Sequence, residues 1–264
     1  MSILSTLTFD AKKITANGLR RLNLLVAALY LVETVAILIL KHGASAVSVQ
    51  TNFLSQDELA SQSVGHTVMA EASRHLFDFK IVYLVGLGLV IVAAVHLLAA
   101  TRNRKLYEAG LKNSNSSLRW KSYALTFGVM SAAAALFIGL HQLILLVVTV
   151  LAAALSLIVV DANEAGATKV ARKLWQVPAG LVAGLIPAFM MGAYLASSYA
   201  YGTPPSAYSY GTLVVWLIYV YIILSVSSGA KRTRKDYLNL ERSYVILGFV
   251  AMSGIAWLIT AGIN

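Results

Sequence analysis

Seven apolar runs dominate the chain, each about as long as a helix that crosses a membrane. A helix of about 20 apolar residues spans the roughly 30 Å hydrocarbon core of a bilayer. The pattern therefore predicts an all-α membrane protein, a single domain over residues 1–264. Its seven transmembrane helices are expected at about 22–40, 80–100, 119–139, 142–160, 174–198, 210–228 and 243–262.

Most connections between the runs are short, which indicates a single bundle. Only Leu140 and His141 separate the third and fourth runs, so these helices should be antiparallel neighbours. The first connection, residues 41–79, is polar and long enough to need structure of its own. Within it, residues 46–53 alternate apolar and polar side chains in the manner of a strand. A small β-hairpin and a disordered loop are both consistent with this connection.

The composition excludes several classes of protein. The chain is 58% hydrophobic and 12% charged, with a mean hydropathy of +0.74, whereas soluble domains contain about 25% charged residues. It has no cysteine, which removes disulfides, thiolate metal sites and cysteine nucleophiles. The sequence also lacks metal-ligand spacing, a phosphate-binding glycine loop and a hydrolase motif. We expect neither a metal site nor enzymatic activity.

The basic residues predict the orientation in the membrane. Of 21 Lys and Arg residues, 18 lie in the N-terminal segment or in and beside the links after the second, fourth and sixth runs. The positive-inside rule then places the N-terminus in the cytoplasm, the C-terminus outside and residues 41–79 in an external loop. Anionic headgroups of the lipid bilayer are the expected partners of this charge. No motif indicates binding of nucleic acid.

Three parts of the sequence resemble one known family. Residues 241–257 read ERSYVILGFVAMSGIAW, residues 115–125 read NSSLRWKSYAL, and His96 lies near the end of the second run. All three are similar to the corresponding parts of heliorhodopsins, and residues 184–187 (GLIP) give a weaker fourth match. The resemblance covers the whole chain. It implies a rhodopsin-like bundle of seven helices with a cytoplasmic N-terminus, the orientation that the charges predict independently.

The chain departs from heliorhodopsins where that family holds retinal. The resemblance implies a retinal-binding lysine at Met252, a glutamate counterion at Ser122 and a serine at Gly248. A thioether cannot form a Schiff base, which needs an amine. We therefore expect no covalent cofactor. The vestigial pocket would be lined by Met252, Ser122, Gly248 and Trp257.

Ionisable groups are rare inside the apolar runs. Glu33 lies about 16 Å into the first run, close to the bilayer centre. Tyr30 lies three residues earlier on the same helix face, and His96 can join them if the first two helices are neighbours. One interpretation is a polar cavity that holds water, a proton or a small anion. The other is a protonated Glu33 that only forms hydrogen bonds within the bundle.

Three hypotheses about function follow. The first is a multi-pass protein of the cell membrane that acts in sensing, regulation or as a scaffold, without ion pumping. The resemblance implies a homodimer, and the basic face suits a cytoplasmic protein partner. The second is a non-covalent binder of retinal, carotenoid or lipid in the vestigial pocket. The third is a proton or small-anion channel or carrier that uses Glu33, Tyr30 and His96.

Overall fold

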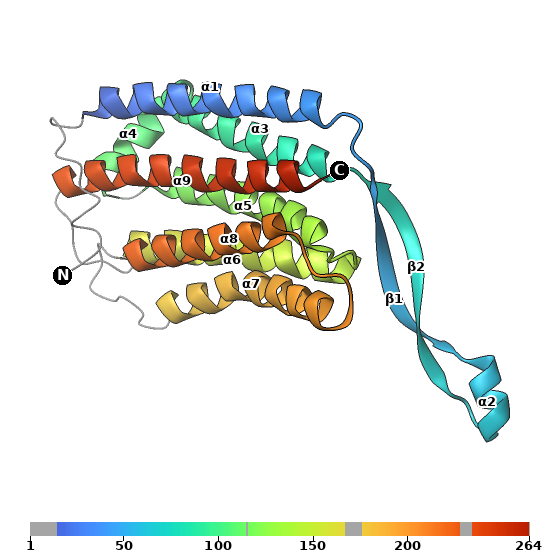
Figure 1. The fold of residues 1–264 in the computed structure, drawn as a ribbon. Coiled ribbons are helices and arrows are strands. Elements are labelled where there is room, and N and C mark those ends of the chain that lie inside the picture. The colour runs from blue at the N-terminus through green and yellow to red at the C-terminus, as the bar shows by residue number, and fades with distance from the viewer. Residues whose placement is uncertain (1–14, 115, 167–175, 228–233, 264) are drawn as a thin grey trace.

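The apolar runs form long helices that lie alongside one another in a bundle (Figure 1). The structure is a computed structural model that describes residues 15–114, 116–166, 176–227 and 234–263. Its helices are α1 (Ala16–Leu40), α2 (Glu58–Val64), α3 (Ile81–Ala100), α4 (Arg104–Lys112), α5 (Ser117–Ile138), α6 (Leu143–Gly166), α7 (Gln176–Tyr201), α8 (Ala207–Ser227) and α9 (Arg234–Gly262). Two strands, β1 (Val47–Gln56) and β2 (Met69–Phe79), lie outside the bundle.

Six of the described helices, namely α1, α3, α5, α6, α7 and α9, contain stretches long and apolar enough to cross a membrane. The described apolar part of α8, Ala207–Ile222, is shorter. A helical, multi-pass membrane fold is thus as predicted, whereas a seventh crossing by α8 stays a prediction. α1 begins earlier than the apolar run, because Thr15 caps it by accepting a hydrogen bond from the Gly18 N–H (3.1 Å).

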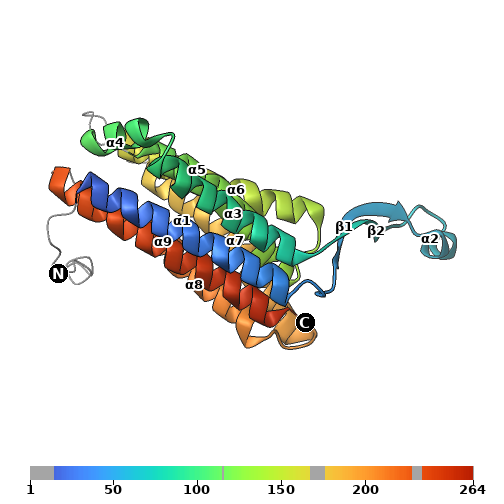
Figure 2. The same ribbon diagram turned by 90° about the horizontal axis from the view of Figure 1, so that it is seen from above.

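The helices α1, α5 and α9 begin at the same end of the bundle, where α4 also lies, and the C-terminus and the strands lie at the opposite end (Figures 1 and 2). The described basic links therefore meet at one end, as the orientation argument requires. Which end faces the cytoplasm stays a prediction. Seven of the basic residues behind that argument lie outside the described residues, namely Lys12, Lys13, Lys169, Arg172, Lys173, Lys231 and Arg232.

The connection over residues 41–79 is an antiparallel pair of strands with the short helix α2 at its tip. The pairing runs from Val47 opposite Phe79 to Gln56 opposite Met69, and the hairpin projects away from the bundle (Figure 1). At its base, the Gln50 N–H donates to the His141 carbonyl at 3.0 Å. This bond ties the hairpin to the turn between α5 and α6.

Gly139 makes the tight turn between α5 and α6. Its φ of +110° lies in the region that favours glycine, and its N–H donates to the carbonyls of Ala135 and Leu136. A Cβ at this position would lie 2.5 Å from a ring carbon of Tyr194. Both the backbone conformation and the space thus require glycine here.

We expect Gly139→Ala to lower the free energy of unfolding by about 1–3 kcal/mol, through backbone strain and the clash with Tyr194. Thermal unfolding in detergent micelles measures the change. Gly43→Ala is the matched control, because a Cβ at Gly43 would meet nothing within 4 Å. Equal melting temperatures for the two variants would contradict the described turn.

Candidate functional site

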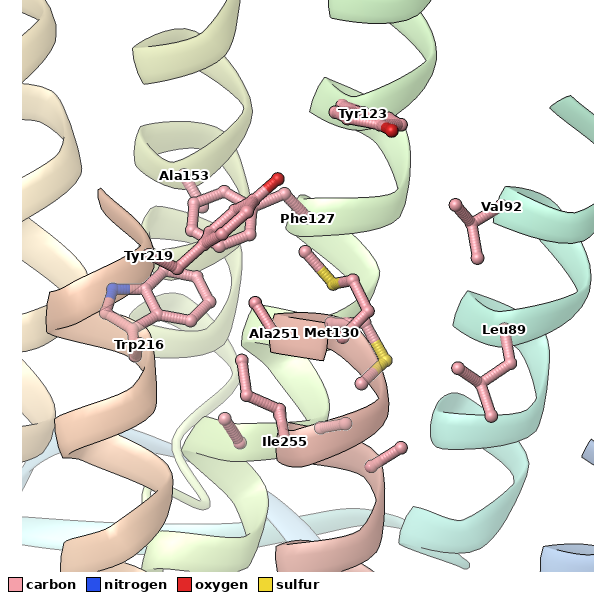
Figure 3. Close-up of a cluster of buried hydrophobic side chains, with 14 of the residues drawn as sticks. Leu89, Val92, Tyr123, Phe127, Met130, Ala153, Trp216, Tyr219, Ala251 and Ile255 are labelled. Atoms are coloured by element: carbon pink, nitrogen blue, oxygen red, sulfur yellow. The ribbon is translucent and has the colours of Figure 1, made fainter. Parts of the chain in front are cut away.

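Met252 lies in a tightly packed part of the bundle core. Its side chain is 3% exposed and belongs to the hydrophobic core cluster of the bundle, to which α1 and α3–α9 contribute. Figure 3 shows Leu89 and Val92 of α3, Phe127 and Met130 of α5, Trp216 and Tyr219 of α8, and Ala251 and Ile255 of α9 in this cluster. The rings of Phe127 and Trp216 stack at 3.9 Å between centroids. Met252 is therefore a buried member of the bundle core.

Ser122 forms a hydrogen bond within its own helix. Its hydroxyl donates to the Leu118 carbonyl of its own helix at 2.6 Å. The next residue, Tyr123, is the one that approaches α9, since a Cβ at Gly248 would lie 3.1 Å from its hydroxyl oxygen. Met252 lies one turn beyond Gly248, or about 6 Å further along the helix. Ser122 is thus bonded to its own backbone, and Tyr123 makes the described approach to α9 at Gly248.

A buried chain of hydrogen bonds begins at His96. Its Nδ1 lies 2.6 Å from the side-chain oxygen of Asn23, so this nitrogen is assigned as the donor. The Asn23 amide donates to the Tyr107 hydroxyl at 3.5 Å. The Tyr107 hydroxyl in turn donates to Glu241 Oε1 at 2.8 Å. The chain connects α3, α1, α4 and α9 near the end of the bundle where α1 and α9 begin.

Glu241 also forms a buried ion pair with Arg119 of α5, and the two side chains are only 1% and 4% exposed. The Arg119 guanidinium lies over the rings of Trp120 and Tyr244, 4.3 Å from each centroid. The Ser116 hydroxyl donates to Glu241 Oε1 at 3.4 Å. A buried charge pair of this kind is stable only while both partners are present.

Tyr107 connects this network to the short helix α4. Burial raises the pKa of Tyr107 to about 12, so its hydroxyl remains protonated near neutral pH and donates to Glu241. Leu111, one turn later, is buried on the same side of α4, while Lys105 and Leu106 are exposed. The helix is therefore amphipathic, and Tyr107 holds its inner face against the bundle.

A small cavity of about 10 Å³ lies beside the network, with room for about one water molecule. His96, Tyr107, Arg119, Tyr123 and Glu241 line it together with Asn23 and several apolar side chains. Within the described part of the chain, His96 Nε2 and the Tyr123 hydroxyl are buried without a hydrogen-bond partner. A water molecule between them would satisfy both groups.

The structure does not bring Glu33 and His96 into one hydrogen-bonded site. Glu33 accepts hydrogen bonds from Ser253 (2.8 Å) and Trp257 (3.4 Å), both on α9. Tyr30 is fully buried and its ring stacks on His96 at 6.1 Å between centroids. Tyr30, Glu33 and His96 were predicted to share a polar cavity. In the structure, Tyr30 packs on His96, whereas the described hydrogen bonds of Glu33 are to α9.

The sequence as a whole was compared with models of known protein families. The family model for heliorhodopsin matches residues 19–263, nearly the whole chain. The chain belongs to the heliorhodopsin family. Heliorhodopsins are generally light-sensing membrane proteins rather than classical enzymes. No curated protein matches the sequence.

The residues of this heliorhodopsin do not fit a covalently bound retinal. The side chain at the expected lysine position is the thioether of Met252, which has no amine. No lysine is among the buried residues of the described chain. Lys41 and Lys80 both donate to backbone carbonyls at the far end of the bundle, those of Ile263 and His42. The described core therefore offers no buried lysine amine for a Schiff base.

Sequence reasoning missed four members of the buried network, namely Asn23, Tyr107, Arg119 and Glu241. Two signals for them were present. Arg119 and Glu241 are opposite charges at the starts of two apolar runs that begin on the same side of the membrane. Tyr107 and Leu111 are spaced one helical turn apart in an otherwise polar link.

Proposed function

We propose that this heliorhodopsin works without a covalent retinal chromophore, as a regulatory or scaffold protein of the membrane rather than as an ion pump or an enzyme. The observation that carries the proposal is Met252, which occupies the lysine position within a packed core. Without an amine at this position, retinal cannot be attached there as a Schiff base, and a light response that depends on such a Schiff base is lost. What is left is a membrane protein that acts through binding.

The basic end of the bundle supports a role in binding. Arg102, Lys105 and Lys112 are exposed on and beside α4, and Tyr107 ties that helix to Glu241 in the core. A partner that moves α4 would thus disturb a buried ion pair. The proposal includes a cytoplasmic location for this end, a protein partner or anionic headgroups on its basic face, and a homodimer.

The two alternative functions have less support. Met252 is 3% exposed and belongs to the hydrophobic core, which argues against a preformed pocket for non-covalent retinal, carotenoid or lipid. Glu33 and His96 bond to different partners, so the described residues do not give a continuous polar path between them. We therefore adopt neither alternative.

Reconstitution with retinal tests the proposal. Purified protein mixed with all-trans retinal is expected to show no red-shifted absorption band, because no amine is available at Met252. The variant Met252→Lys with Ser122→Glu restores an amine and a carboxylate, and is expected to gain a band that hydroxylamine bleaches. Absorption spectra before and after hydroxylamine provide the measurement.

Met252→Leu serves as the matched control, since it alters the same buried position without supplying an amine. It should behave as the unmodified protein does. A hydroxylamine-sensitive band in the unmodified protein or in Met252→Leu would show that another amine binds retinal, and would overturn the proposal.

A further inference from the structure

Glu33 is an acidic side chain at mid-membrane depth. It lies on α1 close to the middle of the apolar run from 22 to 40, about 16 Å from one end and 10 Å from the other. An ionised carboxylate at that depth is energetically unfavourable unless it is paired. The groups around Glu33 therefore determine whether its charge is paired.

Two donors of α9 hold the Glu33 carboxyl group from one side. The Ser253 hydroxyl donates to Oε2 at 2.8 Å and the Trp257 indole N–H donates to Oε1 at 3.4 Å. Ser253 and Trp257 are four residues apart and so lie on one face of α9. Both carboxyl oxygens of Glu33 act as acceptors. Both donors are neutral, so they orient the carboxylate without balancing its charge.

Among the residues that the structure describes, no cation pairs with Glu33. None of the ion pairs among the described residues includes it. The described basic residues of α1, α5 and α9 lie before the apolar runs, as Arg20 and Arg242 do, or within the first turn of a run, as Lys121 does, and not at mid-depth. The countercharge is thus absent from the described chain at the depth where it is needed.

The outer side of Glu33 faces the surface of the bundle. Glu33 itself is half-buried, while Trp257 beside it is 37% exposed. Val32 on α1 and Val250 on α9 are 66% and 60% exposed, so the surroundings are apolar. Figure 2 shows α1 and α9 side by side along the outside of the bundle, and the two helices are in contact. The carboxylate is therefore accessible from the lipid phase at the seam between α1 and α9.

We propose that this seam binds a transmembrane helix of another protein that carries a lysine or arginine at mid-bilayer depth. Glu33 pairs with that cation, and Ser253 and Trp257 hold the carboxylate in place for it. Charged residues within membranes generally pair with one another. A second copy of this chain is a poor occupant, because a symmetric contact would set Glu33 against Glu33. The inference does not rest on the absence of a Schiff base.

Binding of a synthetic helix tests this proposal. The full-length protein is placed in phosphatidylcholine vesicles with a tryptophan-flanked polyleucine helix, and association is measured by energy transfer between fluorophores on the two. Three peptides are compared, with lysine, leucine or glutamate at the centre. The lysine peptide is expected to associate about tenfold more tightly than the leucine peptide.

Two variants make the result specific. Glu33→Gln keeps the size of the side chain and removes its charge, and is expected to bring the lysine peptide to the level of the leucine peptide. Glu58→Gln removes an exposed charge on α2, outside the bundle, and is expected to preserve the preference for lysine. Melting temperatures close to that of the unmodified protein show that both variants fold.

Three outcomes would overturn the proposal. Equal binding of the lysine and leucine peptides would mean that Glu33 is protonated or closed to partners. A preference for lysine that survives Glu33→Gln would place the peptide elsewhere on the bundle. Tightest binding of the glutamate peptide would indicate a shared proton between two carboxyl groups in place of an ion pair.

Discussion

Replacing Glu241 by glutamine is expected to lower the free energy of unfolding by about 3–5 kcal/mol. The change leaves the Arg119 guanidinium 4% exposed in the core without its counter-charge. Glutamine keeps an oxygen that can still accept from Tyr107, so the loss reports on charge rather than on that hydrogen bond. Thermal unfolding in detergent should show a melting temperature lower by roughly 10 °C.

The expected loss is specific to a buried pair, and an exposed pair provides its control. Arg104 and Glu108 pair at 2.6 Å on α4 with side chains 40% and 31% exposed, so Glu108→Gln should cost about 0–1 kcal/mol. Adding Arg119→Met to Glu241→Gln removes both buried charges and should restore part of the lost stability. If Glu241→Gln melts no earlier than Glu108→Gln, the described ion pair does not stabilise the protein.

Much of the fold follows from the sequence because length and apolarity are strong signals for membrane helices. The runs at 80–100 and 119–139 correspond within two residues to α3 and α5. The start of α1 was placed six residues late, because its first turns are polar and are held by the Thr15 cap. The short helix α4 was missed altogether, since a polar amphipathic helix of nine residues gives no signal in a search for apolar runs.

The site was harder to predict because it depends on which residues of distant helices meet. His96 was identified, but its partner Asn23 lies 73 positions away and looks unremarkable in an apolar run. Glu33 was identified by its charge, while its donors Ser253 and Trp257 are 220 and 224 positions away. A charge inside an apolar run can be found from sequence. The sequence alone does not reveal which neighbouring helix that charged side chain faces.

The positions of Arg119 and Glu241 give the basic end of the bundle a physical connection to its core. Glu241 receives hydrogen bonds or charge from α4 and α5 at once, through Tyr107, Ser116 and Arg119. A displacement of α4 would remove one of these partners from a buried carboxylate, which is energetically costly. Under the proposed function, such a connection would transmit binding at the surface to the interior of the bundle.

Replacing Phe127 by alanine is expected to lower the free energy of unfolding by about 3–5 kcal/mol, since it removes a fully buried ring and leaves a cavity. The lost contacts include the stack on Trp216 at 3.9 Å and the packing on Tyr219 at 5.1 Å between centroids. Thermal unfolding in detergent again measures the loss. Phe189→Ala is the matched control, because that phenylalanine is 77% exposed and should contribute little to packing within the bundle.

The comparison of Phe127→Ala with Phe189→Ala also decides between a filled core and a ligand pocket. A ring that packs against Trp216 occupies space that an apolar ligand would need, so a large loss at Phe127 favours a protein that holds no such molecule. Nearly equal melting temperatures for the two variants would mean that the core around Met252 is loosely packed in the folded protein. Non-covalent binding of retinal, carotenoid or lipid would then become the better account of this heliorhodopsin.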